Sequence, residues 1–346
     1  MNSIKPLCRS ILGTVAFGLL LSPLASLAAT PTEGLSLNTS PLPINLVAKP
    51  GTTVTTQLRV MNSGTQTDNL QVGLMKFRSY GESGKPILED RGPGDSYFDW
   101  VHFSEPTFVA EPKVWKTITM TINVPKSAAF GYYYAVTFSR VAQTDTPSVA
   151  HQTVVHGATA TLVLLEAQVP NAKRRVDVLS FLAEHGIYEF LPASLNVRLH
   201  NSGNVHVAPG GNIFISQGGK VVSTLGINAE RGNILPNSNR IFSAQWTDGF
   251  PNYVTKTLNG AAVLDKKGRV VRELKWDLSN AANLRMGHYT ARLLMAYDNG
   301  TRDVPIEATV SFWVIPWRLL GAGLLIAALV LFGLISLGRS LWRRFR

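Results

Sequence analysis

The apolar run at residues 319–337 constrains this chain more than any other feature, because no side chain along it is charged. An α-helix rises about 1.5 Å per residue, so a run of this length nearly crosses a hydrocarbon core of about 30 Å. Trp313 and Trp317 precede the run and Trp342 follows it, and tryptophan side chains concentrate at the two boundaries of a bilayer. The sequence therefore predicts a single transmembrane helix over residues 314–338 rather than a buried helix of a globular core.

The N-terminal end has the organisation of a secretory signal peptide over residues 1–28. A positively charged segment is followed by a mostly apolar stretch at residues 11–21 and then by small residues that suit a cleavage site. We predict cleavage after Ala28, with Ala29 as the alternative. An uncleaved N-terminal anchor is the competing interpretation, but the apolar stretch is short for a span of about 20 residues.

Arginine residues at the C-terminal end indicate the orientation of the predicted span. Arg318 alone precedes the apolar run closely, whereas four arginines lie in the tail at residues 339–346. Because the cytoplasmic flanks of membrane helices are enriched in Lys and Arg, we predict a cytoplasmic tail and an extracytoplasmic N-terminal ectodomain. The signal peptide implies the same topology. We therefore expect a single-pass protein of the cell membrane with its C-terminus in the cytoplasm.

The formal net charge of +11 is concentrated at the two ends of the chain. Lys5 and Arg9 lie in the predicted signal peptide and four arginines lie in the tail, which leaves a net charge of +5 for the rest. No basic run with interleaved aromatic residues occurs, so the sequence argues against nucleic-acid binding. Cys8 is the only cysteine, and the mature chain must therefore fold without disulfides.

Between the two ends, the sequence is typical of β-structure. Short runs alternate apolar and polar residues and are interrupted by Gly, Pro, Asn and Ser, as in antiparallel strands and their turns. Examples are Val54–Val60, Ile118–Val124, Tyr132–Phe138 and Leu195–Leu199. No convincing long amphipathic helix interrupts this pattern. Many short strands at close spacing favour β-sandwiches, and an ectodomain of this length suffices for two.

A weak internal repeat also favours two sandwiches. An alternating strand runs into Asn-Ser-Gly at residues 62–64 in the first half and again at residues 201–203 in the second half. Such a turn uses either a positive φ or an asparagine side chain that bonds the nearby backbone. We expect the two glycines, Gly64 and Gly203, to close equivalent turns.

The polar stretch at residues 170–175 separates the two halves. The predicted organisation is a signal peptide (1–28), a first sandwich (29–172), a second sandwich (173–313), a transmembrane helix (314–338) and a basic cytoplasmic tail (339–346). The predicted fold class is all-β, with two tandem immunoglobulin-like β-sandwiches plus a single C-terminal transmembrane helix.

A set of turn and strand signatures extends over nearly the whole mature chain. They are Ile44–Gly51, residues 62–64 with the strand before them, Trp100–Val109, Val124–Pro125, Gly131–Tyr133, Asn201–Gly211 and Ile234–Pro236. In these stretches the sequence resembles the WxL-interacting family of bacterial surface proteins. The resemblance implies two immunoglobulin-like domains before a C-terminal span and a basic tail. It also implies that the first domain associates with peptidoglycan and the second with host or partner proteins.

The sequence contains no constellation that predicts catalysis or metal binding. His200 and His206 flank the second Asn-Ser-Gly turn, but no cysteine or acidic residue lies between them to complete a metal site. The acidic residues of the segment 82–99 lack the regular spacing of a calcium loop, which favours a solvated hairpin loop. No Gly-x-Ser-x-Gly nucleophile motif and no glycine-rich phosphate loop appear. We therefore predict a protein that is not an enzyme and carries no cofactor or metal.

Aromatic side chains are the best candidates for a binding surface. In the run Tyr132–Tyr134, neighbouring side chains of a strand point to opposite faces, so Tyr133 faces away from the other two. Together with Tyr97 and Trp100, Tyr133 is a candidate for contacting a sugar ring or a protein partner. The competing interpretation places most of these aromatic side chains in the sandwich cores.

The sequence thus predicts a membrane-anchored, extracytoplasmic binding or scaffold protein of the bacterial cell envelope. Its expected ligand is a peptidoglycan-like cell-wall glycan or a surface protein, and we expect the first domain to bind it. One alternative is a pilus-chaperone-like assembly protein that acts by β-strand donation. Another is an accessory subunit of a membrane complex. A permanent anchor suits a scaffold better than a chaperone that must release its client.

Overall fold

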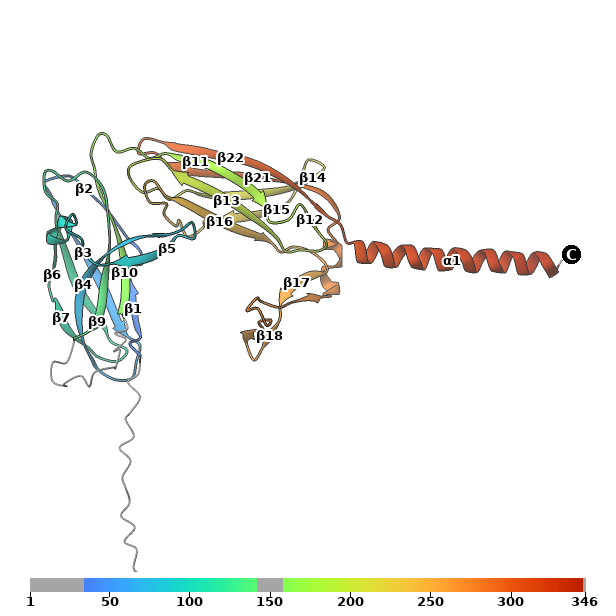
Figure 1. The fold of residues 1–346 in the computed structure, drawn as a ribbon, viewed down its shortest axis with the longest axis horizontal. Helices are drawn as coiled ribbons and strands as arrows, with labels where there is room; N and C mark the ends of the chain where they lie inside the picture. The colour runs from blue at the N-terminus through green and yellow to red at the C-terminus, as the bar shows by residue number, and fades with distance from the viewer. Residues whose placement is uncertain (1–33, 142–157, 345–346) are drawn as a thin grey trace, which may run out of the picture. The chain divides into compact units, whose positions relative to one another are not determined.

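The computed structural model describes residues 34–141 and 158–344. From Leu35 onward, the described residues belong to one compact unit. Figure 1 shows that this unit contains many β-strands, followed by one long C-terminal helix. The predicted fold class, all-β with two immunoglobulin-like sandwiches and a single C-terminal helix, is confirmed. The predicted signal peptide at residues 1–28 lies outside the described residues.

The first sandwich is built from two sheets. Its elements are β1 (Leu37–Ser40), β2 (Ile44–Ala48), β3 (Thr53–Asn62), β4 (Asp68–Tyr80), β5 (Lys85–Glu89), the 3₁₀ helix η1 (Ser96–Trp100), β6 (Val101–Phe103), β7 (Thr107–Ala110), β8 (Trp115–Asn123), β9 (Phe130–Arg140) and β10 (Ala158–Ala167). One sheet has the strand order β1-β3-β8-β6 and the other β2-β10-β9-β4-β5, with β7 pairing to β4. The chain changes sheets between β1 and β2, where Pro41 and Pro43 remove two backbone donors that a continuous strand would use.

Alternating side chains from both sheets form the core of the first sandwich. Leu58 of β3 and Ile118 of β8 come from one sheet, and Phe138 of β9 comes from the other; each is at most 1% exposed. Because side chains alternate between the two faces of a strand, the apolar–polar pattern of these segments places one apolar face in the core. Burying each large side chain stabilises the fold by about 1.5–3 kcal/mol.

The second sandwich is also built from two sheets. Its strands are β11 (Val176–Ala183), β12 (Ile187–Tyr188), β13 (Ala193–Asn201), β14 (Gly210–Gln217), β15 (Lys220–Ile227), β16 (Asn239–Trp246), β21 (Gly287–Asp298) and β22 (Asp303–Val314). The sheet orders are β11-β13-β16 and β12-β22-β21-β14-β15. Trp246 lies at the centre of an aromatic group in this core, with its ring centroid 4.9 Å from that of Tyr289 and 6.2 Å from that of Phe312. The second sandwich therefore has a hydrophobic core of its own.

An insertion separates β16 from β21. It contains β17 (Asn252–Thr255), β18 (Thr257–Leu258), β19 (Ala261–Ala262), β20 (Arg272–Lys275) and the 3₁₀ helix η2 (Leu278–Asn283). Strand β17 pairs with β20, and β18 pairs with β19. None of these five elements contributes a side chain to the core cluster of the second sandwich. The insertion is therefore an appendage of the sandwich rather than part of its core.

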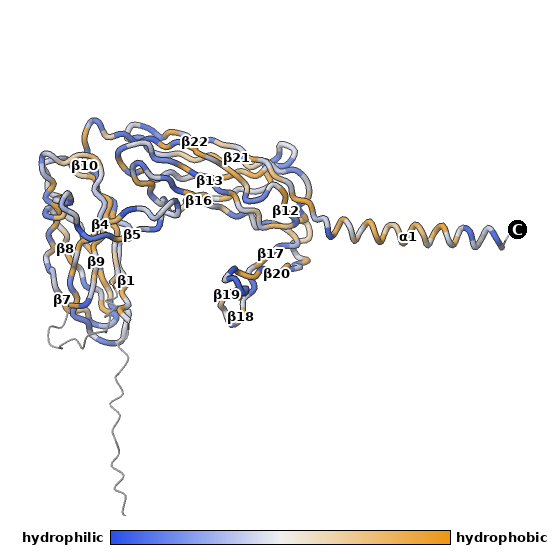
Figure 2. The backbone as a smooth tube through the Cα atoms, viewed as in Figure 1, coloured by the Kyte–Doolittle hydropathy of each residue, from blue (hydrophilic) through white to orange (hydrophobic). Residues whose placement is uncertain are grey.

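The C-terminal helix α1 (Trp317–Arg344) is apolar and exposed. An 18-residue stretch within Trp317–Ser340 has a mean hydropathy of 2.6, and none of that stretch is buried by the described chain. Figure 2 shows hydrophobic residues along most of the helix and hydrophilic residues toward its C-terminal end. A helix that is apolar on all sides needs apolar surroundings. Helix α1 is long and apolar enough to cross a membrane.

The two Asn-Ser-Gly turns have the same hydrogen bonds. The Oδ1 of Asn62 accepts a hydrogen bond from the Gly64 N–H at 2.8 Å, and the Oδ1 of Asn201 accepts one from the Gly203 N–H at 2.9 Å. The Nδ2 of each asparagine donates to two backbone carbonyls of its own sandwich. Neither glycine has a positive φ. The turns therefore use the asparagine side chain, which was one of the two mechanisms that the sequence left open.

Candidate functional site

The turn between β4 and β5 of the first sandwich contacts the second sandwich. The carboxylate of Glu82 in this turn accepts hydrogen bonds from Arg198 Nε and Asn239 Nδ2, both at 2.9 Å. The carbonyl of Glu82 accepts one from the backbone N–H of Ile241 at 2.8 Å. The Arg198 guanidinium, followed by the Asn239 amide, lowers the pKa of the Glu82 carboxyl. These bonds hold the turn against β13 and β16.

A second contact joins β10 and β9 to the start of the second sandwich. Glu166 of β10 is buried and forms an ion pair with Arg174. The Tyr133 hydroxyl of β9 lies 3.5 Å from His206 Nδ1. Burial, and after it the positive charge of Arg174, lowers the pKa of His206 to about 4. The His206 imidazole is therefore neutral at neutral pH.

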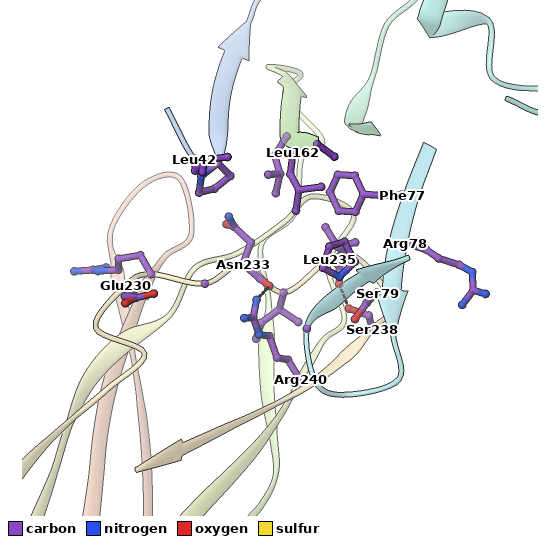
Figure 3. Close-up of a pocket in the computed structure, with 18 of the residues that line it drawn as sticks. Leu42, Phe77, Arg78, Ser79, Leu162, Glu230, Asn233, Leu235, Ser238 and Arg240 are labelled. Carbon is purple, nitrogen blue, oxygen red and sulfur yellow. Dashed lines mark hydrogen bonds between the residues drawn. The ribbon is translucent and has the colours of Figure 1, made fainter. Parts of the chain in front are cut away.

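A pocket of about 540 Å³ is lined by residues from both sandwiches. Figure 3 shows Leu42, Leu162 and Phe77 of the first sandwich on one side of it and Asn233 and Arg240 of the second sandwich on the other. The first group is apolar and the second is polar or charged. The pocket therefore combines an apolar side with a polar side.

The apolar side of the pocket is the outer face of the sheet that contains β10. Leu162 and Leu164 of β10 line the pocket, whereas Val163 and Leu165 belong to the sandwich core. Leu164 is directly opposite Tyr133 of β9 in the antiparallel register, and cross-strand partners share one face of a sheet. Strand β10 is thus apolar on both faces, as expected of a strand that is covered on both sides.

Arg240 occupies the polar side of the pocket. Its side chain lies between Gly84 and Gly232, and a Cβ atom at Gly84 would be only 2.4 Å from the Arg240 Nε. The guanidinium donates to the carbonyl of Asn233 and lies 4.9 Å from the ring centroid of Phe242. Burial lowers the pKa of Arg240, and the buried Nε has no hydrogen-bond partner within the described chain. The Arg240 Nε–H is thus an unpaired hydrogen-bond donor in a partly buried environment.

The charges around the pocket leave its polar side positive. Arg231 and Glu230 both line the pocket. Among the residues that the structure describes, no carboxylate lies within 4.0 Å of the guanidinium of Arg231 or of Arg240. Arg78 also belongs to the lining, but it is paired with Glu89 and points away from the pocket in Figure 3. Arg231 and Arg240 are therefore available to an anionic group.

Strand β10 has an open edge next to this pocket. It pairs with β9 along its whole length, but it pairs with β2 only from Val163 to Ala167. Within the described ranges 34–141 and 158–344, no strand pairs with the second edge of β10 over residues 158–162. Ala160 and Leu162 of this open stretch line the pocket. The Thr161 hydroxyl of this stretch donates a hydrogen bond to the Thr39 hydroxyl of β1 at 3.0 Å. In the described chain, the pocket therefore borders a strand edge without a ladder partner.

The predicted aromatic site residues do not form one surface. Tyr97 and Trp100 lie together at η1, where their ring centroids are 6.3 Å apart and both rings contact Tyr132. Burial raises the pKa of the Tyr97 hydroxyl, followed by the negative charge of Asp95. Tyr133 points to the opposite face of its sheet, as predicted, and contacts Phe77 and His206. A role of Tyr97, Trp100 and Tyr133 in binding stays a prediction.

The polar residues considered for metal binding have other partners. His200 Nδ1 lies 2.8 Å from Asn239 Oδ1, and His206 contacts Tyr133. In the acidic segment 82–99, Glu82 bonds Arg198 as described above, and three further acids form ion pairs with Lys76, Arg78 and Arg91. In the described part of the chain, no group of three His, Cys, Asp or Glu side chains could hold a metal ion.

Sequence reasoning missed the pocket residues on both sides. One signal for the apolar side was present: the uninterrupted apolar run Leu162–Leu165 predicts a strand covered on both faces rather than on one. No comparable signal marked Arg240, because a single arginine in an alternating strand usually faces solvent.

No protein-family model and no curated protein sequence matches this chain. Among solved structures, the chain is similar to the class 5 fimbriae chaperone CfaA, with 12% sequence identity, a TM-score of 0.36, and coverage of 79% of this chain and 98% of that chain. It is also similar to the E. coli chaperone DraB, with 12% identity, a TM-score of 0.33, and coverage of 80% and 99%. A third similar structure is the CsuC–CsuE chaperone–tip adhesion subunit complex of Acinetobacter baumannii, with 12% identity, a TM-score of 0.35, and coverage of 79% and 97%. At these identities, the likeness concerns the fold alone.

Proposed function

We propose that this protein is a membrane-anchored, extracytoplasmic binding protein that holds an extended segment of a protein partner in the pocket between its two sandwiches. The observation that carries the proposal is the open edge of β10 at residues 158–162, because Ala160 and Leu162 of this edge line the pocket. The protein then acts by binding rather than by catalysis. Helix α1, with its apolar length, keeps it at the membrane.

Strand addition explains how such a segment is bound. The unpaired N–H and C=O groups of an edge strand bond an incoming strand whatever its sequence, and pockets for alternate side chains supply the selectivity. Here Leu162 and Phe77 provide apolar contacts beside the edge. We therefore expect a segment that alternates small or β-branched apolar residues with polar ones.

The two arginines add a second element of recognition. Arg240 has an unused buried donor, and Arg231 has no carboxylate partner in the described chain. A carboxylate bound there would form charge-assisted hydrogen bonds, which are about twice as strong as neutral ones. The segment is therefore expected to carry a carboxylate near its apolar residues, either as a side chain or as a chain terminus.

A protein partner has more support than a cell-wall glycan. Sugar rings are usually bound on exposed aromatic faces, and Tyr97 and Trp100 pack together with Tyr132 instead of forming such a platform with Tyr133. The resemblance of the sequence to the WxL-interacting family is compatible with a surface protein as the partner.

Two forms of this function differ in the fate of the bound segment. A scaffold holds it, and the permanent anchor favours this form. A pilus-chaperone-like assembly protein passes it on, and the open edge of β10 favours this form. The dissociation rate in the presence of a competing strand separates the two, because only an assembly protein is expected to release its segment to a competitor.

A peptide-binding measurement on the full chain in lipid nanodiscs tests the proposal. The probe is a fluorescent peptide of alternating Val and Thr with a free C-terminal carboxylate, followed by fluorescence anisotropy. Replacing Leu162 by Glu places a charge beside the open edge, and we expect the affinity to fall by about tenfold or more, which corresponds to about 1.4 kcal/mol. The matched control is Leu182→Glu, because Leu182 is an exposed leucine of β11 outside the pocket lining.

Hydrogen exchange measured on the same samples locates the peptide. Bound peptide should slow amide exchange in residues 158–162 of the parent protein and leave β6, an edge strand of the other sheet, unchanged. Equal affinities for Leu162→Glu and Leu182→Glu, or slowed exchange confined to another strand, would contradict the proposed site.

A further inference from the structure

The segment after β20 exposes large apolar side chains. Trp276 is 53% exposed, Leu278 is 77% exposed, and Leu284 and Met286 are 46% and 50% exposed. These residues flank and include the 3₁₀ helix η2, which is capped by the Asp277 carboxylate at the Ser279 N–H. Such side chains in one short segment form an apolar patch of the kind that marks an interaction surface.

Strand pairing places this segment beside the start of helix α1. Gly287, which directly follows Met286, pairs with Val314 at the end of β22, three residues before α1 begins at Trp317. In the neighbouring pair, the ring centroids of His288 and Trp313 lie 5.0 Å apart. Because these registers belong to one continuous sheet, the segment and the first turn of α1 lie at the same end of the second sandwich.

Phe250 packs against two of these exposed residues, Leu284 and Trp276, at the same end of the second sandwich. It forms an isolated bridge with Leu284, and its ring centroid lies 5.8 Å from that of Trp276. Trp313 and Trp317 are themselves 47% and 48% exposed. We name the six residues Trp276, Leu278, Leu284, Met286, Trp313 and Trp317 the apolar collar.

The charge next to the apolar collar is positive. Residues 250–283 contain six Lys or Arg and three Asp or Glu residues. One of these acids, Asp265, is already paired with Arg269. At the base of the insertion, Arg285 is paired with Asp248, and Arg318 with Glu189. The insertion therefore carries an excess of basic groups, among them Lys266 and Lys267, which form no ion pair with an acid of the described chain.

We infer that the apolar collar is a bilayer-contacting surface, which seats the second sandwich on the outer headgroup region of an anionic membrane. The inference rests on the proposed membrane anchoring by α1, which brings the collar to the depth where tryptophan and leucine side chains partition into the headgroup boundary. The basic insertion contributes attraction to anionic lipid, which each Lys or Arg near a membrane surface provides. The second sandwich then has two attachments to the membrane, the helix and the collar.

Single-cysteine labelling of the full chain in nanodiscs tests this inference. Cys8 is the only cysteine, so a Cys8→Ser background accepts one environment-sensitive fluorophore at a chosen site. Leu278→Cys probes the collar, Val109→Cys is a matched exposed control in the first sandwich (55% exposed), and Leu329→Cys probes α1. Quenching is measured with lipids that carry a quencher near the headgroup and with aqueous iodide.

We expect the fluorophore at position 278 to be quenched several-fold more by lipid than the one at 109, and several-fold less by iodide. The lipid quenching at 278 should increase when phosphatidylglycerol is added to phosphatidylcholine nanodiscs. Equal iodide quenching at 278 and 109 overturns the inference. Protection at 278 without lipid quenching also overturns it, because another protein surface would then cover the collar.

The label at position 329 separates this inference from the anchor itself. Lipid quenching at 329 without lipid quenching at 278 means that α1 spans the bilayer while the collar does not touch it. Absence of lipid quenching at 329 means that the proposed anchoring fails, and the inference about the collar fails with it.

Discussion

Asn62 and Asn201 have the same structural role in the two sandwiches. Each is fully buried, accepts a hydrogen bond from the glycine two residues later, and donates to two backbone carbonyls. The carbonyl of each also accepts a backbone N–H, from Lys113 in the first sandwich and from Asn237 in the second. One polar side chain thereby satisfies several buried backbone groups, which is why a polar residue is stable in this position.

Replacing Asn201 by Ala is expected to destabilise the second sandwich. The Gly203 N–H and the Val205 carbonyl lose the Asn201 side chain as a partner, and the Ile234 carbonyl keeps only the Val207 N–H, so we expect a loss of about 2–4 kcal/mol in the free energy of unfolding. Urea unfolding followed by Trp fluorescence measures it, because Trp246 lies in the affected core. Asn62→Ala is the counterpart, and it should lower the stability of the first sandwich instead. An unchanged unfolding midpoint for both variants would contradict this role.

The two glycines of these turns differ in how tightly they are packed. A Cβ atom at Gly203 would lie 2.2 Å from the carbonyl oxygen of Lys173, whereas one at Gly64 would meet only the Asn62 Oδ1, at 3.0 Å. Because backbone must move in the first case, Gly203→Ala should cost about 1–3 kcal/mol in the free energy of unfolding. Gly64→Ala should cost less. Thermal melting of both variants checks the order, and a larger loss for Gly64→Ala would refute the packing argument.

His206 makes stability depend on pH. Its folded pKa of about 4 lies below the ordinary value of about 6.5, so the unfolded chain binds more protons between these values. Stability from this group is therefore present at pH 7 and is lost as the pH falls from about 6.5 toward 4. We expect a loss of about 2 kcal/mol between pH 7 and pH 5, measured by urea unfolding. His206→Gln should lose less over the same interval, and an equal loss in both proteins would exclude His206 as the source.

At the scale of elements, the β4–β5 turn contacts the second sandwich mainly through one residue, Glu82. Glu82 bonds Arg198 and Asn239, and its carbonyl receives the Ile241 N–H. The turn reaches β16 because β4 and β5 extend beyond the body of the sheet as a two-stranded ribbon, paired from Lys76 with Glu89 to Tyr80 with Lys85. The same ribbon carries Gly84, which allows the Arg240 side chain to lie against it.

Removing the Glu82 carboxylate should loosen this contact without unfolding either sandwich. In Glu82→Ala we expect faster hydrogen exchange at the Ile241 amide, because the bond to the Glu82 carbonyl is no longer supported by the side-chain pair. Glu89→Ala is the matched control, since Glu89 pairs with Arg78 within the same ribbon. Hydrogen exchange of β16 peptides, followed by mass spectrometry, measures the change. If Glu89→Ala accelerates exchange at Ile241 equally, the effect belongs to the ribbon and not to the contact.

At the scale of the whole molecule, the pocket needs both sandwiches. Its apolar side belongs to the first sandwich and its arginines to the second. The sequence alone led us to expect binding by the first domain, whereas the proposed site predicts that neither sandwich by itself reproduces the binding of the full chain. In the proposed arrangement, the exposed helix α1 and the apolar collar hold this unit at the membrane.

The topology predicts the outcome of a protease experiment. If the ectodomain lies outside and the arginine tail inside, as the sequence predicts, protease added to intact spheroplasts should remove residues before α1 and leave a small C-terminal fragment. An epitope after Arg346 should remain on that fragment until the membrane is permeabilised. Survival of the full-length chain in intact spheroplasts would contradict the orientation.

Local patterns were sufficient to predict the β-strands, the apolar C-terminal helix and the orientation of individual side chains. The alternation at Ile118, Met120 and Ile122 predicted a buried face, and all three are fully buried. Tyr133 was expected on the face opposite Tyr132 and Tyr134, and it lies there. These predictions succeed because the two-residue period of a strand and the continuity of an apolar run are properties of neighbouring residues.

The sequence by itself thus determined the fold class, the apolar span and the faces of the strands, whereas the tertiary structure decided the candidate site. Leu162 and Arg240 are 78 residues apart in the chain and line one pocket. The open edge of β10 exists because the pairing of β2 with β10 begins only at Ile44, opposite Val163. No pattern within β10 indicates where this pairing begins. Strand periodicity specifies which face a residue occupies, but not which distant segment covers that face. That choice depends on the packing of whole elements, whose contacts join residues far apart in sequence.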